Sequence, residues 1–254
     1  MKNIIMITGA SSGIGLEFAL QIDTAFSNID EIWLIARRES RLKEIAKVMQ
    51  HNVRTIAMDV SDEYAMDDLE NLLAESHVMV RMLINAAGFG LIGSFEDISL
   101  EEQLDMLLVN CEALTKMTYI TLPYMAKGSR IIQMASSAAF LPQPDFAVYA
   151  ATKSYVLTLS RALNKELEYR GISVTAVCPG PVKTEFFDIA QKYNNISYIK
   201  RLSMISVEKC VRAALRASYL KESMVVPGFY MKVFLAATKC IPHDCILSFM
   251  NLIK

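Results

Sequence analysis

Apolar and polar positions along the chain follow two alternating patterns, which predict a repeating order of strands and helices. Short, nearly uninterrupted apolar runs alternate with longer segments in which apolar residues recur every three or four positions. Continuous apolar runs are typical of strands that are buried on both faces of a parallel sheet. The runs predict seven strands, at residues 3–8, 31–36, 53–60, 78–85, 130–136, 172–178 and 224–228.

The intervening segments have helical periodicity. They predict a helix that begins near Gly13 and further helices near residues 39–50, 62–76, 99–126, 147–170 and 206–218. Right-handed crossovers then build a doubly wound α/β sheet of the Rossmann type, with helices on both faces. No linker or repeat divides the chain, so we expect one domain over residues 1–254, with an excursion at 185–205 and an apolar extension at 228–254.

Composition narrows the class of protein. A chain of 254 residues with 53% hydrophobic residues fills a sizeable core, and a net charge of −1 offers no basic field for nucleic acid. Five irregularly spaced cysteines fit a reduced, cytoplasmic protein, and the spacing in "CIPHDC" is unlike that of a zinc site, so we expect no metal. The first strand starts at Asn3, so we expect no signal peptide, and we expect no transmembrane segment because apolar runs are too short.

A glycine-rich turn, "TGASSGIG", joins the first strand to the first helix. Glycine permits positive φ angles and a close approach of the backbone to a pyrophosphate, which the helix N-terminus also attracts. An ordinary strand-to-helix turn is the alternative, but three glycines between a strand and a helix favour nucleotide binding. The predicted contacts in this turn are Gly9, Ser11, Ser12, Gly13, Ile14 and Gly15.

The tip of the second strand indicates which dinucleotide is bound. An acidic residue that binds the ribose 2′-hydroxyl is usual at this position, but here Ala36 is followed by Arg37 and Arg38. Guanidinium groups match a phosphate, whereas two solvated arginines would be unfavourable at the start of a helix. The sequence therefore predicts NADP(H) rather than NAD(H).

Tyr149 and Lys153 stand four positions apart in a predicted helix, so they share one face. A free tyrosine has a pKa of roughly 10, and a nearby ammonium together with a charged nicotinamide ring would lower that pKa. By itself this spacing is also common in surface pairs. Upstream, a buried-looking strand ends in Ser136 and Ser137, at the edge of the sheet where ligands bind.

Together these residues resemble the short-chain dehydrogenase/reductases over residues 3 to about 230. The glycine pattern TGxxxGxG of that family matches Thr8 to Gly15, its NAAG element matches Asn85 to Gly88, and its YxxxK element matches Tyr149 to Lys153. The catalytic serine of the family usually stands thirteen residues before the tyrosine, which favours Ser136 over Ser137.

The resemblance implies roles for individual residues. Tyr149 would exchange the proton, Ser136 would bind the substrate oxygen, Lys153 would bind the ribose and tune Tyr149, and Asn110 would hold a relay water. Asp59 and Val60 would contact adenine, and the loop "PGPVKTEF" would contact the nicotinamide. The further cofactor contacts implied are Asn85, Ala86, Ala87, Tyr149, Lys153, Pro179, Gly180, Val182 and Thr184.

Two departures from the family pattern are visible. Ala139 stands where a glycine is common, and no basic residue lies inside the glycine-rich turn. The second departure leaves a 2′-phosphate dependent on Arg37, Arg38 and Ser11, so tolerance of NADH stays open.

The substrate is less well specified. Apolar side chains in "FLPQPDF" and "EFFDIAQKYNNISY" suggest a lipophilic carbonyl or alcohol, such as a 3-ketoacyl group or a steroid ketone, although these side chains also fit a role in covering the core. An NADP(H)-binding sensor or scaffold is the alternative function, and an extended sugar-nucleotide epimerase is disfavoured by the short chain.

Two further expectations concern assembly and the tail. The family implies a homodimer or homotetramer formed through the two long helices. The extension 228–254, two short helices separated by Pro242, is expected to act as a lid or a subunit contact, with peripheral membrane contact as a third role.

Overall fold

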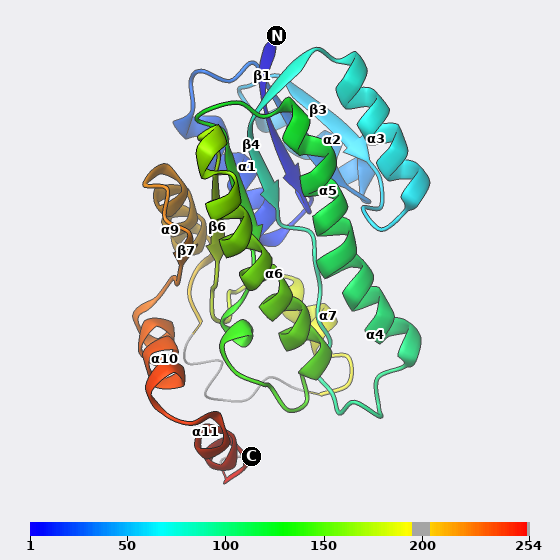
Figure 1. Ribbon diagram of the computed structural model, residues 1–254. Coiled ribbons are helices and arrows are strands. Elements are labelled where there is room, and N and C mark those ends of the chain that lie inside the picture. The colour runs from blue at the N-terminus through cyan, green and yellow to red at the C-terminus, as the bar shows by residue number, and fades with distance from the viewer. Residues whose placement is uncertain (195–203, 253–254) are drawn as a thin grey trace.

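The centre of the molecule is a parallel sheet of seven strands in the order β3-β2-β1-β4-β5-β6-β7 (Figure 1). The computed structural model describes residues 1–194 and 204–252, and the side chains up to residue 248. The strands are β1 (Lys2–Thr8), β2 (Glu31–Ala36), β3 (Val53–Ala57), β4 (Val78–Asn85), β5 (Arg130–Met134), β6 (Ser173–Val177) and β7 (Met224–Val225). The doubly wound fold predicted from the sequence is confirmed.

Helices cover both faces of this sheet. One face packs against α1 (Gly13–Ala25), α2 (Glu39–Val48) and α9 (Val207–Tyr219), and the other packs against α3 (Glu63–Glu75), α5 (Leu114–Thr121) and α6 (Ala147–Glu166). The remaining helices in the described part of the chain are α4 (Leu100–Leu107), α7 (Phe186–Ala190), α10 (Phe229–Cys240) and α11 (His243–Leu252). Trp33 and Phe18 are among the largest fully buried side chains, one on each side of the sheet.

The strand order reverses between β1 and β4. The register of these neighbouring strands shifts between Ile4 and Ile5 and is then regular to their ends, where Thr8 lies beside Asn85. The loops that leave β1 and β4 then turn to opposite faces of the sheet and open a crevice, which is where ligands bind in open α/β sheets.

The strands β3 and β7 end earlier than the sequence predicts. β3 ends at Ala57 rather than at residue 60, because Asp59 accepts hydrogen bonds from the backbone N–H and the hydroxyl of Ser61 and so turns the chain. β7 contains two residues, and the chain leaves the sheet before Pro227, which has no N–H to donate. Both differences arise from local turns that hydrophobic patterning does not record.

The long helix predicted at residues 99–126 is interrupted. Between α4 and α5 the chain forms a π-helical segment at Leu108–Ala113, and after α5 it ends in a 3₁₀ turn, Leu122–Tyr124. A π segment accommodates extra residues within an otherwise α-helical path, and such segments are frequent at functional sites. Here it contains Asn110.

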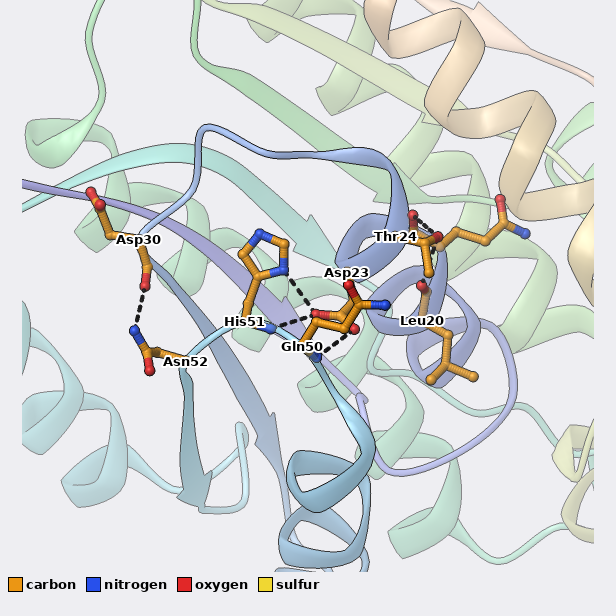
Figure 2. A network of polar contacts seen from close by, with 8 residues as sticks. Leu20, Asp23, Thr24, Asp30, Gln50, His51 and Asn52 are labelled. Carbon is orange, nitrogen blue, oxygen red and sulfur yellow. Dashed lines mark hydrogen bonds and ion pairs between the residues drawn. The ribbon is translucent and has the colours of Figure 1, made fainter.

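A polar network ties the end of α1 to the turn before β3 (Figure 2). The buried carboxylate of Asp23 accepts hydrogen bonds from the backbone N–H groups of Gln50 and His51 at 2.8 and 2.9 Å, and its Oδ1 lies 2.8 Å from Nδ1 of His51. The network satisfies backbone donors that would otherwise be unpaired, and so fixes the path of the chain into β3.

The C-terminal extension forms two helices, α10 and α11, which are separated at Pro242 as the sequence predicts. They lie below β7 and α9, toward the lower end of the molecule in Figure 1. No helix in the described part of the chain is long and apolar enough to cross a membrane. Much of the predicted excursion 185–205 lies outside the described residues, but α7 and an isolated bridge between Val182 and Ile205 belong to it.

Candidate active site

A cavity of about 1570 Å³ opens at the carboxyl ends of the strands. Its lining comes from the glycine-rich turn, from the loops that follow β2, β3, β4, β5 and β6, and from α6, α7, α10 and α11. Pockets for drug-sized ligands measure roughly 300–1,000 Å³, so this cavity has room for a dinucleotide and a second molecule.

The glycine-rich turn is built so that only glycine fits. Gly9 has a φ of +67°, and a Cβ there would lie 2.8 Å from the backbone nitrogen of Ala87. A Cβ on Gly15 would lie 2.2 Å from the carbonyl oxygen of Gly9. The hydroxyl of Thr8 accepts hydrogen bonds from the N–H groups of Ala86 and Ala87, which holds the two loops together at the switch point.

The start of α1 suits an anion. The Ser12 side chain caps no backbone N–H group of this helix, and the first turn carries no acidic residue. The N–H groups at the helix start therefore keep their partial positive charge toward the cavity, which is what a pyrophosphate requires. The turn and the helix start fit the predicted dinucleotide.

Both predicted arginines line the cavity, with different partners. Arg37 lies 3.5 Å from the carboxylate of Asp59, and its side chain is 75% exposed. Arg38 donates from Nε to the hydroxyl of Ser11 at 3.2 Å and from Nη1 to Glu185 at 3.1 Å. The hydrogen bond to Ser11 joins the start of α2 to the glycine-rich turn and places one guanidinium group beside the cavity.

Tyr149 and Lys153 are buried, with 7% and 5% of their surfaces exposed, so a surface ion-pair role is excluded. Both project from the first half of α6 into the cavity. The Lys153 ammonium donates to the carbonyl of Met134 at 2.8 Å and lies 5.6 Å from the centre of the Tyr149 ring. One face of the helix thus presents both groups at the end of β5.

Burial is the largest influence on the pKa of Tyr149 in the protein without cofactor. Burial raises it to about 12, opposed by a hydrogen bond with Ser136, and Lys153 is not among the groups that lower it. Burial also lowers the pKa of Lys153 to about 8, because the charged form loses hydration. In the protein alone the phenol is therefore not acidified, and the lowering of its pKa by the ammonium together with a charged nicotinamide ring stays a prediction.

Ser136 is the serine that faces the tyrosine. It precedes a 3₁₀ turn, Ser137–Phe140, and its hydroxyl accepts from the N–H of Ala138 at 3.1 Å while hydrogen-bonding Tyr149. Ser137 also lines the cavity, and its backbone N–H is bound to the carbonyl of Pro179. The structure brings Ser136 and Tyr149 together as the spacing argument expects.

Two predicted site residues do not line the cavity. Asn110 is fully buried behind it, donating to the carbonyl of Phe89 at 2.8 Å and to the hydroxyl of Thr152, and accepting from the N–H of Phe89. Asn85 is buried beneath the sheet edge, where it donates to Thr118 and Gln133. Asn110 thus braces the loop that follows β4, and Asn85 ties the end of β4 to α5 and β5.

The other predicted residues all border the cavity. They are Gly9, Ser11, Ser12, Gly13, Ile14, Gly15, Arg37, Arg38, Asp59, Val60, Ala86, Ala87, Ser136, Tyr149, Lys153, Pro179, Gly180, Val182 and Thr184.

Sequence reasoning did not assign the aromatic surroundings of Tyr149 to individual residues. The ring of Phe146 stacks on Tyr149 with centroids 4.2 Å apart, and the ring of Phe186 lies 5.6 Å away. Gly90 leaves no space between the loop after β4 and the tyrosine ring. The apolar segments around residues 140–146 and 185–198 were the available signal, but which of their side chains meet the tyrosine depends on the fold.

The C-terminal extension adds to the cavity wall. Tyr230, Met231 and Phe234 of α10 and Ile246 of α11 line it. Met231 packs against Gly180 so closely that a Cβ there would lie 2.7 Å from its side chain. Phe234 lies 6.4 Å from Phe140, centroid to centroid.

Known proteins share this arrangement. The family model for short chain dehydrogenases matches residues 3–194. Sulfoacetaldehyde reductase 2 of Chromohalobacter salexigens is 35% identical over 193 residues, covering 73% of this chain and 75% of the relative. An uncharacterized oxidoreductase of Staphylococcus epidermidis is 32% identical over 185 residues, covering 72% of this chain and 79% of the relative.

Solved structures superpose on most of the chain. A short-chain dehydrogenase from Sphingobium yanoikuyae in complex with NADPH superposes with a TM-score of 0.80 at 26% identity, covering 99% of this chain and 96% of that one. Serine dehydrogenase complexed with NADP+ superposes with a TM-score of 0.78 at 25% identity, covering 88% of this chain and 93% of that one. The chain belongs to the short-chain dehydrogenase family and is an oxidoreductase of that class.

Proposed function

We propose that this protein is an NADPH-dependent reductase of a lipophilic carbonyl compound, with reversible interconversion of ketone and alcohol. The observation that carries the proposal is the meeting of Ser136, Tyr149 and Lys153 in one cavity whose other end carries Arg37 and Arg38. A pure binding protein has no need of the first three residues in that arrangement.

The cofactor is proposed from the residues at the arginine end of the cavity. The glycine-rich turn and the start of α1 would hold the pyrophosphate, and Arg38, fixed by Ser11, would bind a 2′-phosphate as a planar, permanently charged donor. Asp59 and Val60 would contact adenine, and Thr184 would lie near the nicotinamide. NADPH and NADP+ in two related structures support this assignment.

The reaction would proceed by hydride and proton transfer. When bound, the reduced nicotinamide supplies a hydride to the carbonyl carbon. Ser136 donates a hydrogen bond to the carbonyl oxygen, and the Tyr149 hydroxyl gives that oxygen its proton, leaving a phenolate. Lys153, beside the cofactor ribose, stabilises the phenolate, and Asn110 holds the loop and the water path from which the proton is replaced.

Substrate class is proposed from the walls near Tyr149. Phe146, Phe186, Phe187, Ile189 and Met231 line that part of the cavity, which suits an apolar group next to the carbonyl. Among the described lining residues, the basic side chains are Arg37, Arg38 and Lys153. Of these three, Lys153 lies beside Tyr149 and would meet an anionic aldehyde such as that named for the Chromohalobacter relative, but it is proposed to serve the ribose.

The experiment that tests this function is a substrate panel. Loss of NADPH absorbance would be followed with bulky ketones, 3-ketoacyl thioesters and steroid ketones, and with sulfoacetaldehyde as the anionic control. Faster turnover of the lipophilic compounds supports the proposal. Turnover of the anionic aldehyde alone contradicts the substrate class, and NADPH binding without turnover of any compound favours the sensor alternative.

The cellular setting belongs to the same proposal. The five cysteines are free thiols, which suits a cytoplasmic protein, and the extension 228–254 would act as a lid because α10 and α11 supply side chains to the cavity. A homodimer or homotetramer would form through α4, α5 and α6.

A further inference from the structure

The carboxylate of Glu185 reaches across the mouth of the cavity to the groups proposed to bind phosphate. Its Oε2 accepts from Nη1 of Arg38 at 3.1 Å, its Oε1 lies 3.6 Å from Nη2 of Arg41, and it hydrogen-bonds the side chain of Ser12. The hydrogen bond from Arg38 is the largest influence that lowers the pKa of Glu185, so this residue is ionised at neutral pH.

These contacts join parts of the chain that are far apart in sequence. Glu185 stands immediately before α7, Arg38 stands immediately before α2, and Ser12 belongs to the glycine-rich turn. The adjoining Thr184 packs against Gly13, where an added Cβ would lie 3.3 Å from Cβ of the threonine. The carboxylate therefore meets the same guanidinium and hydroxyl groups that a phosphate of the cofactor would use.

We infer that Glu185 is an internal competitor for the anion subsite at Arg38 and thereby sets how tightly the protein binds a 2′-phosphorylated cofactor. The inference rests on the proposed function, because it takes Arg38 as the 2′-phosphate ligand. A guanidinium has a limited set of N–H donors in a fixed plane, and a phosphate that approaches Arg38 must share or replace those given to Glu185.

Repulsion acts in the same direction as competition. A carboxylate that remains next to a bound 2′-phosphate places two negative groups around one arginine, which raises the free energy of the complex. NADH lacks that phosphate, so it binds without displacing Glu185 from Arg38 and without this repulsion. Glu185 therefore weakens NADPH binding more than NADH binding. It reduces the preference for NADPH over NADH that Arg37 and Arg38 create.

The same residue links the two ends of the cavity. Phe186, which follows Glu185, begins α7 and packs against the ring of Tyr149 with centroids 5.6 Å apart. Because the two residues are consecutive, the carboxylate at the phosphate subsite and the ring beside Tyr149 belong to one short stretch of chain.

Direct binding measurements test the inference without catalysis. Dissociation constants for NADPH, NADH and 2′,5′-ADP would be measured by fluorescence or calorimetry on the wild-type protein and on Glu185→Gln. We expect Glu185→Gln to tighten NADPH and 2′,5′-ADP by roughly 3- to 10-fold, and NADH by less than half that factor. In an Arg38→Gln background, Glu185→Gln is expected to give no such gain.

Glu39→Gln is the matched control. Glu39 follows Arg38 directly and pairs with Lys43, so its removal changes the local charge equally without touching the Arg38 hydrogen bonds. It is expected to change NADPH and NADH affinity by the same small factor. Glu185→Asp, which keeps the charge but withdraws the carboxylate, should lie between wild type and Glu185→Gln and guards against a folding defect in the first variant.

The outcomes separate this inference from the function on which it rests. Unchanged or weaker NADPH binding by folded Glu185→Gln, with tight NADPH binding by the wild type, overturns the role of Glu185 alone. A wild-type protein that binds NADH more tightly than NADPH overturns the cofactor assignment and, with it, this inference.

Discussion

Gly90 and Tyr149 are in contact so close that the loop after β4 fixes the position of the phenol ring: a Cβ on Gly90 would lie 2.3 Å from Cδ2 of Tyr149. The ring also stacks against Phe146. A glycine and a phenylalanine thus both contact the tyrosine ring, and its position depends on the absence of a methyl group at Gly90.

Gly90→Ala is expected to displace the Tyr149 ring. A misplacement of about 1 Å costs on the order of 10²-fold in rate, so kcat should fall by about that factor while the NADPH dissociation constant stays near the wild-type value. Steady-state kinetics and direct binding measure the two quantities. Gly128→Ala is the control. Gly128 has a φ of +88°, so the variant should be less stable, but it lies in a turn outside the described cavity lining, so kcat should not fall.

Lys153 should make the stability of the cofactor-free protein depend on pH. Burial lowers its pKa from 10.5 to about 8, so between these values the unfolded chain binds a proton that the folded chain does not. Stability then rises with pH in this window, by about 1.4 kcal/mol per pH unit, or about 2 kcal/mol from pH 8 to 9.5.

The measurement is urea unfolding of wild type and Lys153→Met at these two pH values. The wild type should gain about 2 kcal/mol relative to the variant, while Lys47→Met, which removes an exposed lysine of α2, should follow the wild type. A parallel pH dependence in wild type and Lys153→Met would show that Lys153 is not the group responsible.

Removal of both arginines should reveal the cofactor preference. Arg37→Ala combined with Arg38→Ala removes the guanidinium groups proposed to bind the 2′-phosphate, so the NADPH dissociation constant should rise by roughly 10²-fold and that of NADH by less than 5-fold. Equal losses for both cofactors would contradict the assignment. Arg216→Ala, on α9 and outside the cavity lining described, should change neither constant.

Exposed apolar side chains on α4 and α6 should form a subunit contact. Leu104 and Leu107 of α4 are 52% and 42% exposed, and they share a groove with Tyr155 of α6, which is 43% exposed. Leu104→Lys should shift the protein toward the monomer in light scattering, whereas Tyr169→Lys, at an 87% exposed position away from that groove, should not. A monomeric wild type would contradict the proposed assembly.

The order and type of the central elements could be predicted because each buried strand appears as an apolar run and each amphipathic helix has its own period. The π-helical interruption at Leu108–Ala113 could not be predicted. A π segment preserves the general apolar character of its helix while it changes which residues face the core. Asn110 lies in this segment, and its place behind the loop, hydrogen-bonded to Phe89, depends on that shift.

In the candidate site, too, some features could be predicted from the sequence and others depend on the fold. The glycines and the Tyr149 and Lys153 pair could be identified because their chemistry requires particular residue types at fixed spacing. The pKa of Tyr149 could not, because desolvation depends on Phe146 and Phe186, which lie on different segments and meet only in the folded chain. The contact of Glu185 with Arg38 spans 147 positions and leaves no local pattern.

The raised pKa of Tyr149 assigns a specific task to the bound cofactor. Burial raises the pKa of the phenol to about 12 in the protein alone, so we propose that the positive charge of the oxidised nicotinamide, together with the ammonium of Lys153, would stabilise the phenolate once the cofactor is bound. The central claim is therefore that the hydroxyl of Tyr149 is the proton donor to the carbonyl oxygen.

Single-turnover oxidation of bound NADPH by Tyr149→Phe tests that claim most directly, because the variant keeps the ring between Gly90 and Phe146 and removes only the hydroxyl. With a ketone that the wild type reduces, the variant should bind NADPH with a near-native dissociation constant and show a rate lowered by at least about 10³-fold. Reduction at a rate within 10-fold of the wild type would contradict the account.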